Sequence, residues 1–280
     1  MVVKKIGIYN ENTIPGSSHQ LVIEIGNDEL MCLSKNLITL EVIAFELFAI
    51  EKEDNINWNK ILYAFKTTSE ILKYKYQEVK CFFNLDELVL IPEEMQGESA
   101  AEDYLNLIYG ENNKQLLCYE NVTYANHFIS AYRVPKIIID NIHQTFENCQ
   151  LGHTYSVILK DVMGRTDLHS FFLKIQFYTT HFVLGVWKLG KLQIIQSYKY
   201  FQPEDVIYYL LRIVQQFEMD ALQTELELSG MIEEDADIYV KLLKIFGKIK
   251  NQHMLPNGIF QNVSAKHPAY YFSPFYNLSL

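Results

Sequence analysis

The feature that most constrains this sequence is an order of predicted elements that occurs twice. Between Phe171 and Gly230, three strand-like runs come first, an amphipathic helix follows, and one more strand closes the series. The strands are predicted at 171–176, 181–187, 192–195 and 224–228, and a tight turn at 188–191 joins the second to the third. They are rich in the branched and aromatic residues that favour strands. The alternation of strands with a helix predicts a sheet covered by a helix.

The predicted helix of this stretch begins at Pro203. Proline suits the first helical position because no backbone N–H is needed there, and the acids Glu204 and Asp205 suit the positive end of the helix dipole. Its apolar stripe consists of Val206, Leu210, Ile213 and Phe217, widened by Ile207, Leu211 and Val214. We expect this stripe to pack on the sheet.

The same order is predicted near the start of the chain, after a polar leader. Strands are predicted at 21–26, 30–33 and 41–50, with a turn at Asn27 and Asp28, although 41–50 is also long enough for a helix. A helix capped by Asn57 follows, and 78–83 returns as a strand. The apolar side of that helix carries Trp58, Ile61, Leu62, Phe65, Ile71 and Leu72. A repeat of this kind indicates two similar α/β halves, at about 1–150 and 151–280.

A different unit interrupts the first half at about 85–132. It comprises a strand at 88–91, a helix at 100–109 ended by Gly110, and a hairpin of 116–119 with 127–132. The remaining predictions are a helix from Pro135 through Phe146, a strand at 155–159, a helix from Glu233 to Ile249, and an aromatic segment at 270–276 that packs on the body.

Composition and charge restrict the classes of function. Hydrophobic residues make up 49% of the chain and charged residues 21%, as in a folded globular protein. The net charge of −10 disfavours broad binding to nucleic acid, which needs a basic surface. The sequence shows no signal-peptide core and no apolar run of membrane-spanning length, so we expect a cytoplasmic protein without a transmembrane segment. The four cysteines form no CxxC pair and are expected to be buried free thiols.

The familiar catalytic motifs are missing from the sequence. No HExxH, GxSxG or Walker-type loop occurs, and the eight histidines form no metal-ligand spacing. We therefore assign no catalytic residue and no metal site from such motifs.

The duplicated order resembles the actin-like, ribonuclease H-like ATPase fold, and within it the bacterial type IV pilus assembly and cell-division actin homologues. Those families begin each half with an acidic residue and a glycine at a strand end, which hold metal and phosphate. The run Ile23-Glu24-Ile25-Gly26 is similar to the first such motif, with Glu24 where Asp is usual. The unit at 85–132 resembles the strand-helix-strand-strand subdomain that these homologues insert. The chain thus resembles a small uncharacterised bacterial family with this fold.

The second motif of the resemblance falls at 173–180, where Lys174 stands in place of the acid and Gln176 in place of the glycine. Leu226 to Gly230 is similar to the adenosine-site turn, with Met231 and Ile232 in place of further glycines. A magnesium triphosphate needs close backbone approach and a carboxylate, and a lysine cannot ligate a cation. Residue patterns alone give plainer interpretations: Glu24 as the solvent-side residue of an alternating strand, and Ser229-Gly230 as a turn.

Two functions of different classes stay open. The first is a degenerate, non-hydrolysing actin-like scaffold that binds other proteins and needs no cofactor, which Lys174 and Gln176 favour. The second is an active nucleotide-binding ATPase that uses ATP with magnesium. For that alternative, the resemblance implies that the cofactor-binding residues are Glu24, Gly26, Thr179, Thr180, Ser229 and Gly230. A protein partner is expected, and nucleic acid is not.

Overall fold

The computed structural model describes the chain except residues 11–14, 52–55, 93–94, 96–99, 124–126, 164, 166–167, 169, 253–257, 264–266 and 269. The chain forms two compact units. The first contains residues 1–164 together with 257–259 and Ser279, and the second contains 165–256, 260–278 and Leu280. The expected boundary at residue 150 falls inside β9 (Cys149–His153), a strand of the first sheet, so the division comes later, after α4 (Thr154–Met163).

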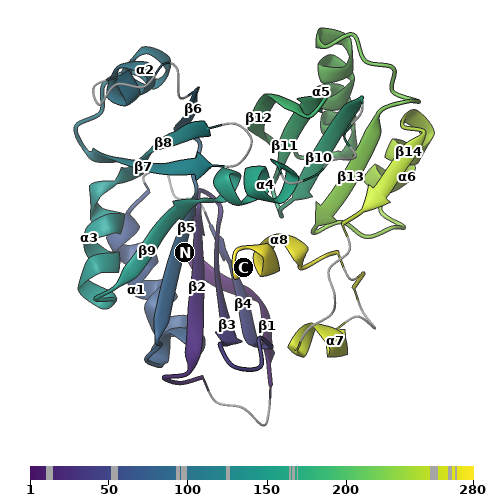
Figure 1. Ribbon diagram of the computed structural model, residues 1–280. Helices are drawn as coiled ribbons and strands as arrows, with labels where there is room; N and C mark the ends of the chain where they lie inside the picture. Colours follow the sequence, from purple (N-terminus) through teal and green to yellow (C-terminus); the bar gives the residue numbers. More distant parts are fainter. Residues whose placement is uncertain are drawn as a thin grey trace. The chain divides into compact units, whose positions relative to one another are not determined.

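The first unit is built on a six-stranded sheet with the order β1-β4-β3-β2-β5-β9 (Figure 1). The remaining strands are β1 (Val2–Tyr9), β2 (His19–Gly26), β3 (Glu29–Asn36), β4 (Val42–Ile50) and β5 (Glu78–Asn84). The pairs β1–β4, β4–β3 and β3–β2 are antiparallel, whereas β2–β5 and β5–β9 are parallel. The segment at 41–50 is therefore a strand. Strand β1 was not predicted, because the region before Leu21 was interpreted as a polar leader.

Helices provide the crossovers that parallel strands require. Helix α1 (Trp58–Thr68) and the short 3-10 helix η1 (Ile71–Lys73) connect β4 to β5, and α3 (Lys136–Thr145) lies beside α1. The Asn57 cap is confirmed, because its side-chain oxygen accepts a hydrogen bond from the Lys60 N–H at 3.2 Å.

The inserted subdomain forms as expected. Strands β6 (Leu88–Pro92), β8 (His127–Pro135) and β7 (Gln115–Thr123) make an antiparallel sheet in that order, and α2 (Ala100–Tyr109) packs on it. Gly110 has φ +81°, a left-handed conformation that suits glycine and ends α2.

The second unit repeats the strand order of the first. Its sheet runs β12-β11-β10-β13-β14, which matches β4-β3-β2-β5-β9 in both order and direction. The strands are β10 (Phe171–Phe177), β11 (His181–Lys188), β12 (Lys191–Lys199), β13 (Glu225–Gly230) and β14 (Lys248–Asn251). The repeated element order is therefore confirmed.

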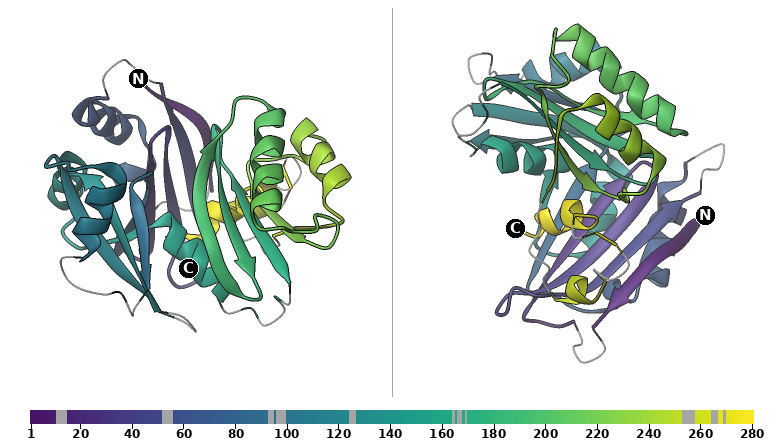
Figure 2. Two further views of the ribbon diagram at one scale, coloured as in Figure 1. Left: turned by 90° about the horizontal axis from the view of Figure 1, so that it is seen from above. Right: turned by 90° about the vertical axis from the view of Figure 1, so that its right-hand side faces the viewer.

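Helices α5 (Pro203–Gln216) and α6 (Asp237–Ile245) pack side by side on this sheet (Figure 2). Val206, Leu210 and Ile213 of α5 are buried in the core of the unit, as the apolar stripe predicted. Two short helices, α7 (Ile259–Val263) and α8 (Ser273–Asn277), follow. The aromatic segment packs on the body, because Tyr270, Phe272 and Phe275 are buried.

Two predicted elements were wrong. The run at 155–159 is part of α4, not a strand; its buried residues Tyr155, Ile158, Leu159 and Val162 recur at helical spacing. A short apolar run does not distinguish the two structures. The helix expected from Glu233 to Ile249 spans only Asp237–Ile245, and residues 248–251 instead form β14, which pairs with β13.

All four cysteines are free, but burial differs among them. Cys32 and Cys81 are buried, whereas Cys118 and Cys149 are only half-buried.

We expect Leu210→Ala to lower the free energy of unfolding by about 2–5 kcal/mol, because it removes buried methyl groups and leaves a cavity in the core. The exposed Gln215 lies on the same helix, and Gln215→Ala should cost less than about 0.5 kcal/mol. Chemical denaturation of both variants measures the difference. Equal losses would mean that the buried face of α5 is assigned wrongly.

Candidate functional site

The first motif places Glu24 inside the first unit rather than at its surface. Glu24 is 3% exposed, and its carboxylate accepts a hydrogen bond of 2.7 Å from the Thr154 hydroxyl, at the start of α4. All eight residues of β2 are buried, so no face of this strand meets solvent. The interpretation of Glu24 as a solvent-side residue was therefore wrong. At Gly26, a Cβ would lie 3.3 Å from the Glu29 carbonyl oxygen, so the chain is closely packed at this strand end.

Groups of the chain itself occupy the N-terminus of α4. The backbone N–H of His153 donates to Glu120 at 2.9 Å, and that of Tyr155 donates to His153 Nδ1 at 3.1 Å. His153 Nε2 therefore carries the hydrogen and donates to the Leu85 carbonyl at 3.1 Å. Burial lowers the pKa of His153 to about 3, against the opposing effect of Leu85, so the ring is neutral. Sequence reasoning missed this arrangement because it predicted a strand here.

In the second motif, Lys174 forms a buried ion pair. Lys174 is 1% exposed, and its ammonium lies 2.6 Å from Glu227, its direct neighbour across β10 and β13. Arg165 also binds Glu227, with Nη1 2.6 Å from Oε2 and Nη2 3.0 Å from Oε1. Burial alone would raise the pKa of Glu227, but the hydrogen bonds from Arg165 and the charge of Lys174 outweigh it and lower that pKa. The carboxylate is thus ionised and held by two cations.

Gln176 also points to a neighbour within the unit. Its amide donates to the Tyr178 hydroxyl at 2.9 Å, and the buried Tyr178 ring stacks on His181 with a centroid distance of 4.6 Å. The next residues, Thr179 and Thr180, are exposed. A large ring therefore occupies the β10–β11 connection, where close approach of a phosphate would call for small residues.

Ser229 and Gly230 lie inside the second unit. The Ser229 hydroxyl donates to the Ile175 carbonyl at 3.3 Å and is fully buried. Gly230 has φ +88°, and a Cβ there would collide with the Phe177 carbonyl oxygen. This glycine is required for close packing of two strand ends.

The candidate residues of each unit gather at the carboxyl end of its central strands. In the second unit, Thr179, Thr180, Ser229 and Gly230 all lie at this end of β10 and β13, since Phe177 pairs with Gly230. Glu24 and Gly26 occupy the same end of β2 in the first unit. This is the edge where open α/β sheets bind ligands.

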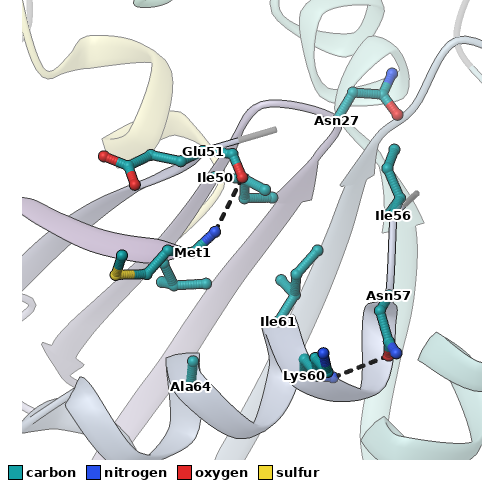
Figure 3. Close-up of a pocket in the computed structure, with 10 residues that line it drawn as sticks. Met1, Asn27, Ile50, Glu51, Ile56, Asn57, Lys60, Ile61 and Ala64 are labelled. Carbon is teal, nitrogen blue, oxygen red and sulfur yellow. Dashed lines mark hydrogen bonds between the residues drawn. The ribbon is translucent and has the colours of Figure 1, made fainter. Parts of the chain in front are cut away.

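The first unit also contains hollows that the sequence did not reveal. One of about 280 Å³ has apolar walls from Val2, Ile50 and Ile61, and the Asn57 cap and Lys60 lie at its rim (Figure 3). Two others, of about 320 and 400 Å³, adjoin each other, since both are lined by Lys66, Leu72, Thr145 and Phe146, and we call them together the α1–α3 groove. Their walls come from segments far apart in the sequence.

Within the described part of the chain, no group of three or more His, Cys, Asp or Glu side chains is arranged to hold a metal ion. None of the described helices combines the length and apolar character needed to cross a membrane.

Comparison with known proteins gives a family and a fold. A family model described as "Protein of unknown function (DUF3822)" matches residues 10–249. No curated protein matches the chain. A Bacteroides thetaiotaomicron protein with actin-like ATPase fold and unknown function aligns with a TM-score of 0.74 and 18% identity, over 95% of this chain and 97% of its own. A chain of the PilM–PilN type IV pilus biogenesis complex aligns with a TM-score of 0.58 and 9% identity, over 93% and 97%. The actin-like fold is confirmed.

We expect Gly230→Ala to lower the free energy of unfolding by about 2 kcal/mol or more, because it adds a backbone collision to the strain of a left-handed residue. Gly190 is the matched control: it has φ +73° with nothing within 4 Å of an added Cβ, and Gly190→Ala should cost only about 1 kcal/mol. Urea denaturation compares the two. Similar costs would contradict the close approach at Gly230.

Lys174→Met should lower the free energy of unfolding by about 3 kcal/mol, because it leaves the buried Glu227 with one cation instead of two. Lys199, exposed at the end of β12, provides the control, and Lys199→Met should change stability by less than about 0.5 kcal/mol. If Lys174→Met lowered the free energy of unfolding no more than Lys199→Met does, that result would argue against the ion pair.

The difference between wild type and Lys174→Met should also depend on pH. Because the pKa of Glu227 is lowered in the folded state, its stabilising effect is complete above the unfolded carboxyl pKa of about 4.3 and is lost as the pH falls through the folded value. Denaturation curves between neutral and acid pH should show the two proteins converging in stability at low pH.

Proposed function

The chain belongs to the DUF3822 family, and we propose that it is a non-hydrolysing protein with the actin-like fold whose task is to bind other proteins in the bacterial cytoplasm. The observation that carries the proposal is the ion pair of Lys174 with Glu227 at the second motif. The four cysteines of the chain are free thiols, which supports the cytoplasmic part of the proposal, because the cytoplasm is a reducing compartment.

The residues of the second unit do not fit a magnesium triphosphate. A cation at Lys174 cannot ligate Mg²⁺, and it is already paired, so it is not available to a phosphate either. Glu227 lies at the same level but holds Lys174 and Arg165. Gln176 and Tyr178 fill the space near the strand end where glycine would let a phosphate approach the backbone.

Protein binding is supported by the fold and its neighbours. PilM, which shares the fold at low identity, has been solved in a complex with PilN that serves type IV pilus biogenesis. A fold retained without its nucleotide keeps the exposed surfaces through which such proteins meet partners. The alternative of an active ATPase rests on the exposed Thr179 and Thr180 and on the Glu24 carboxylate.

Calorimetric titration of ATP into the purified chain, with and without magnesium, tests the proposal. We expect no saturable binding in the physiological millimolar range and no phosphate release above background. The physical reason is that the second motif presents a lysine already paired with Glu227 and a buried tyrosine instead of a carboxylate and a glycine.

Micromolar, magnesium-dependent binding that weakens in Glu24→Gln or Thr180→Ala would overturn the proposal in favour of the ATPase. Thr145, exposed at the end of α3 in the first unit, is the matched control, and Thr145→Ala should leave any ATP binding unchanged. Variants of Gly230 are unsuitable for this test, because that glycine is required for packing.

A further inference from the structure

Helix α2 exposes an apolar surface that the core of its subdomain does not use. Leu107 is 82% exposed and Ile108 60% exposed, whereas Ala101 and Leu105 on the other side of the helix are buried. Neighbouring apolar side chains with this exposure are typical of interaction surfaces.

This surface also carries acidic side chains. The exposed acids Glu102 and Asp103 lie in the first turn of α2, and Asp103 lies one helical turn before Leu107 on the same face. Helix α2 itself contains no lysine or arginine. The surface therefore suits a basic partner with an apolar centre.

The α1–α3 groove has the opposite character. Its apolar residues include Leu62, Leu72, Ile142 and Phe146, and Lys66 and Lys75 lie along it with one acid, Glu147. Neither lysine forms an ion pair with a described residue. The groove is thus apolar inside and locally basic.

We propose that α2 of one copy docks in the α1–α3 groove of a second copy of this chain. Leu107 and Ile108 enter the apolar part of the groove, and the acids of the first turn, Glu102 and Asp103, face Lys66 and Lys75. A helix that lays its apolar side in a groove is a common mode of recognition, and charge complementarity fixes its direction. Helices α1, α2 and α3, which supply the two surfaces, all belong to the first unit (Figure 1). Every copy therefore carries both surfaces, and the partner is always present at the concentration of the chain itself.

The contact joins two different surfaces and is therefore heterologous. Each copy keeps one unused α2 and one unused groove, so the assembly is an open chain or a closed ring. This contact rests on the proposed function, and a second copy of the chain is then the protein partner. Self-association and ATP binding are measured separately, so either can fail without the other.

Sedimentation velocity of the full chain over a concentration series tests the contact. We expect association that increases with concentration and weakens as salt screens the charges. Leu107→Glu should lower the association constant about tenfold or more, because it places a charge in the apolar part of the groove. Leu222, 63% exposed in the second unit, is the matched control, and Leu222→Glu should leave association unchanged.

A charge exchange tests the direction of the contact. Asp103→Lys and Lys66→Glu should each weaken association when studied alone, because like charges then meet in the interface. In an equimolar mixture, each copy finds a partner of complementary charge, and association should return to about the wild-type level. Circular dichroism melting of each variant establishes that it is folded.

Three results would overturn the proposal. One is a chain that stays monomeric at its highest soluble concentration in low salt. Another is association that Leu107→Glu does not weaken in a folded variant. The third is a mixture of the two charge variants that associates no better than either alone.

Discussion

The ion pair between Lys174 and Glu227 determines what the second unit can do at its candidate site. Both side chains lie on central parallel strands whose surroundings exclude water, so neither charge is tolerable without the other. Arg165 completes the cluster by holding both carboxylate oxygens. A change that restored an acid at Lys174 would bring two carboxylates together and leave Arg165 as the single cation. At this level of the sheet, Lys174, Glu227 and Arg165 are therefore bound to one another.

The equivalent positions of the first unit show how the two halves differ. In the first unit, Glu24 of β2 is paired with Phe82 of β5. At the equivalent position of the second unit, Lys174 of β10 is paired with Glu227 of β13. Two residues further along, Gly26 is paired with Asn84 in the first unit, and Gln176 is paired with Ser229 in the second. Each half thus keeps one carboxylate at this level of its sheet, but on a different strand. In the first unit a hydroxyl binds it, and in the second two cations do.

Local patterns predicted the elements whose signals are local. The Asn57 cap, the stripe of α5 and the glycine that ends α2 each follow from neighbouring residues. The burial of Glu24 was missed because alternation assumes one solvent face, whereas β2 is covered on both. Arg165 could not be linked to Glu227, since they are 62 residues apart and no motif joins them. The α1–α3 groove was missed for the same reason.

The first unit contains segments from both ends of the chain, and this affects the order in which its parts are synthesised. Domains generally fold as units during synthesis, the N-terminal one first. Here Gly258, which adopts φ +58° against the Val42 backbone, and Ser279, whose carbonyl accepts a hydrogen bond of 3.0 Å from Lys35, both belong to the first unit. The ribosome adds them only after residues 165–256. The first unit therefore cannot be completed until nearly all of the second has been synthesised, and Lys35 and Val42 lack these neighbours until then.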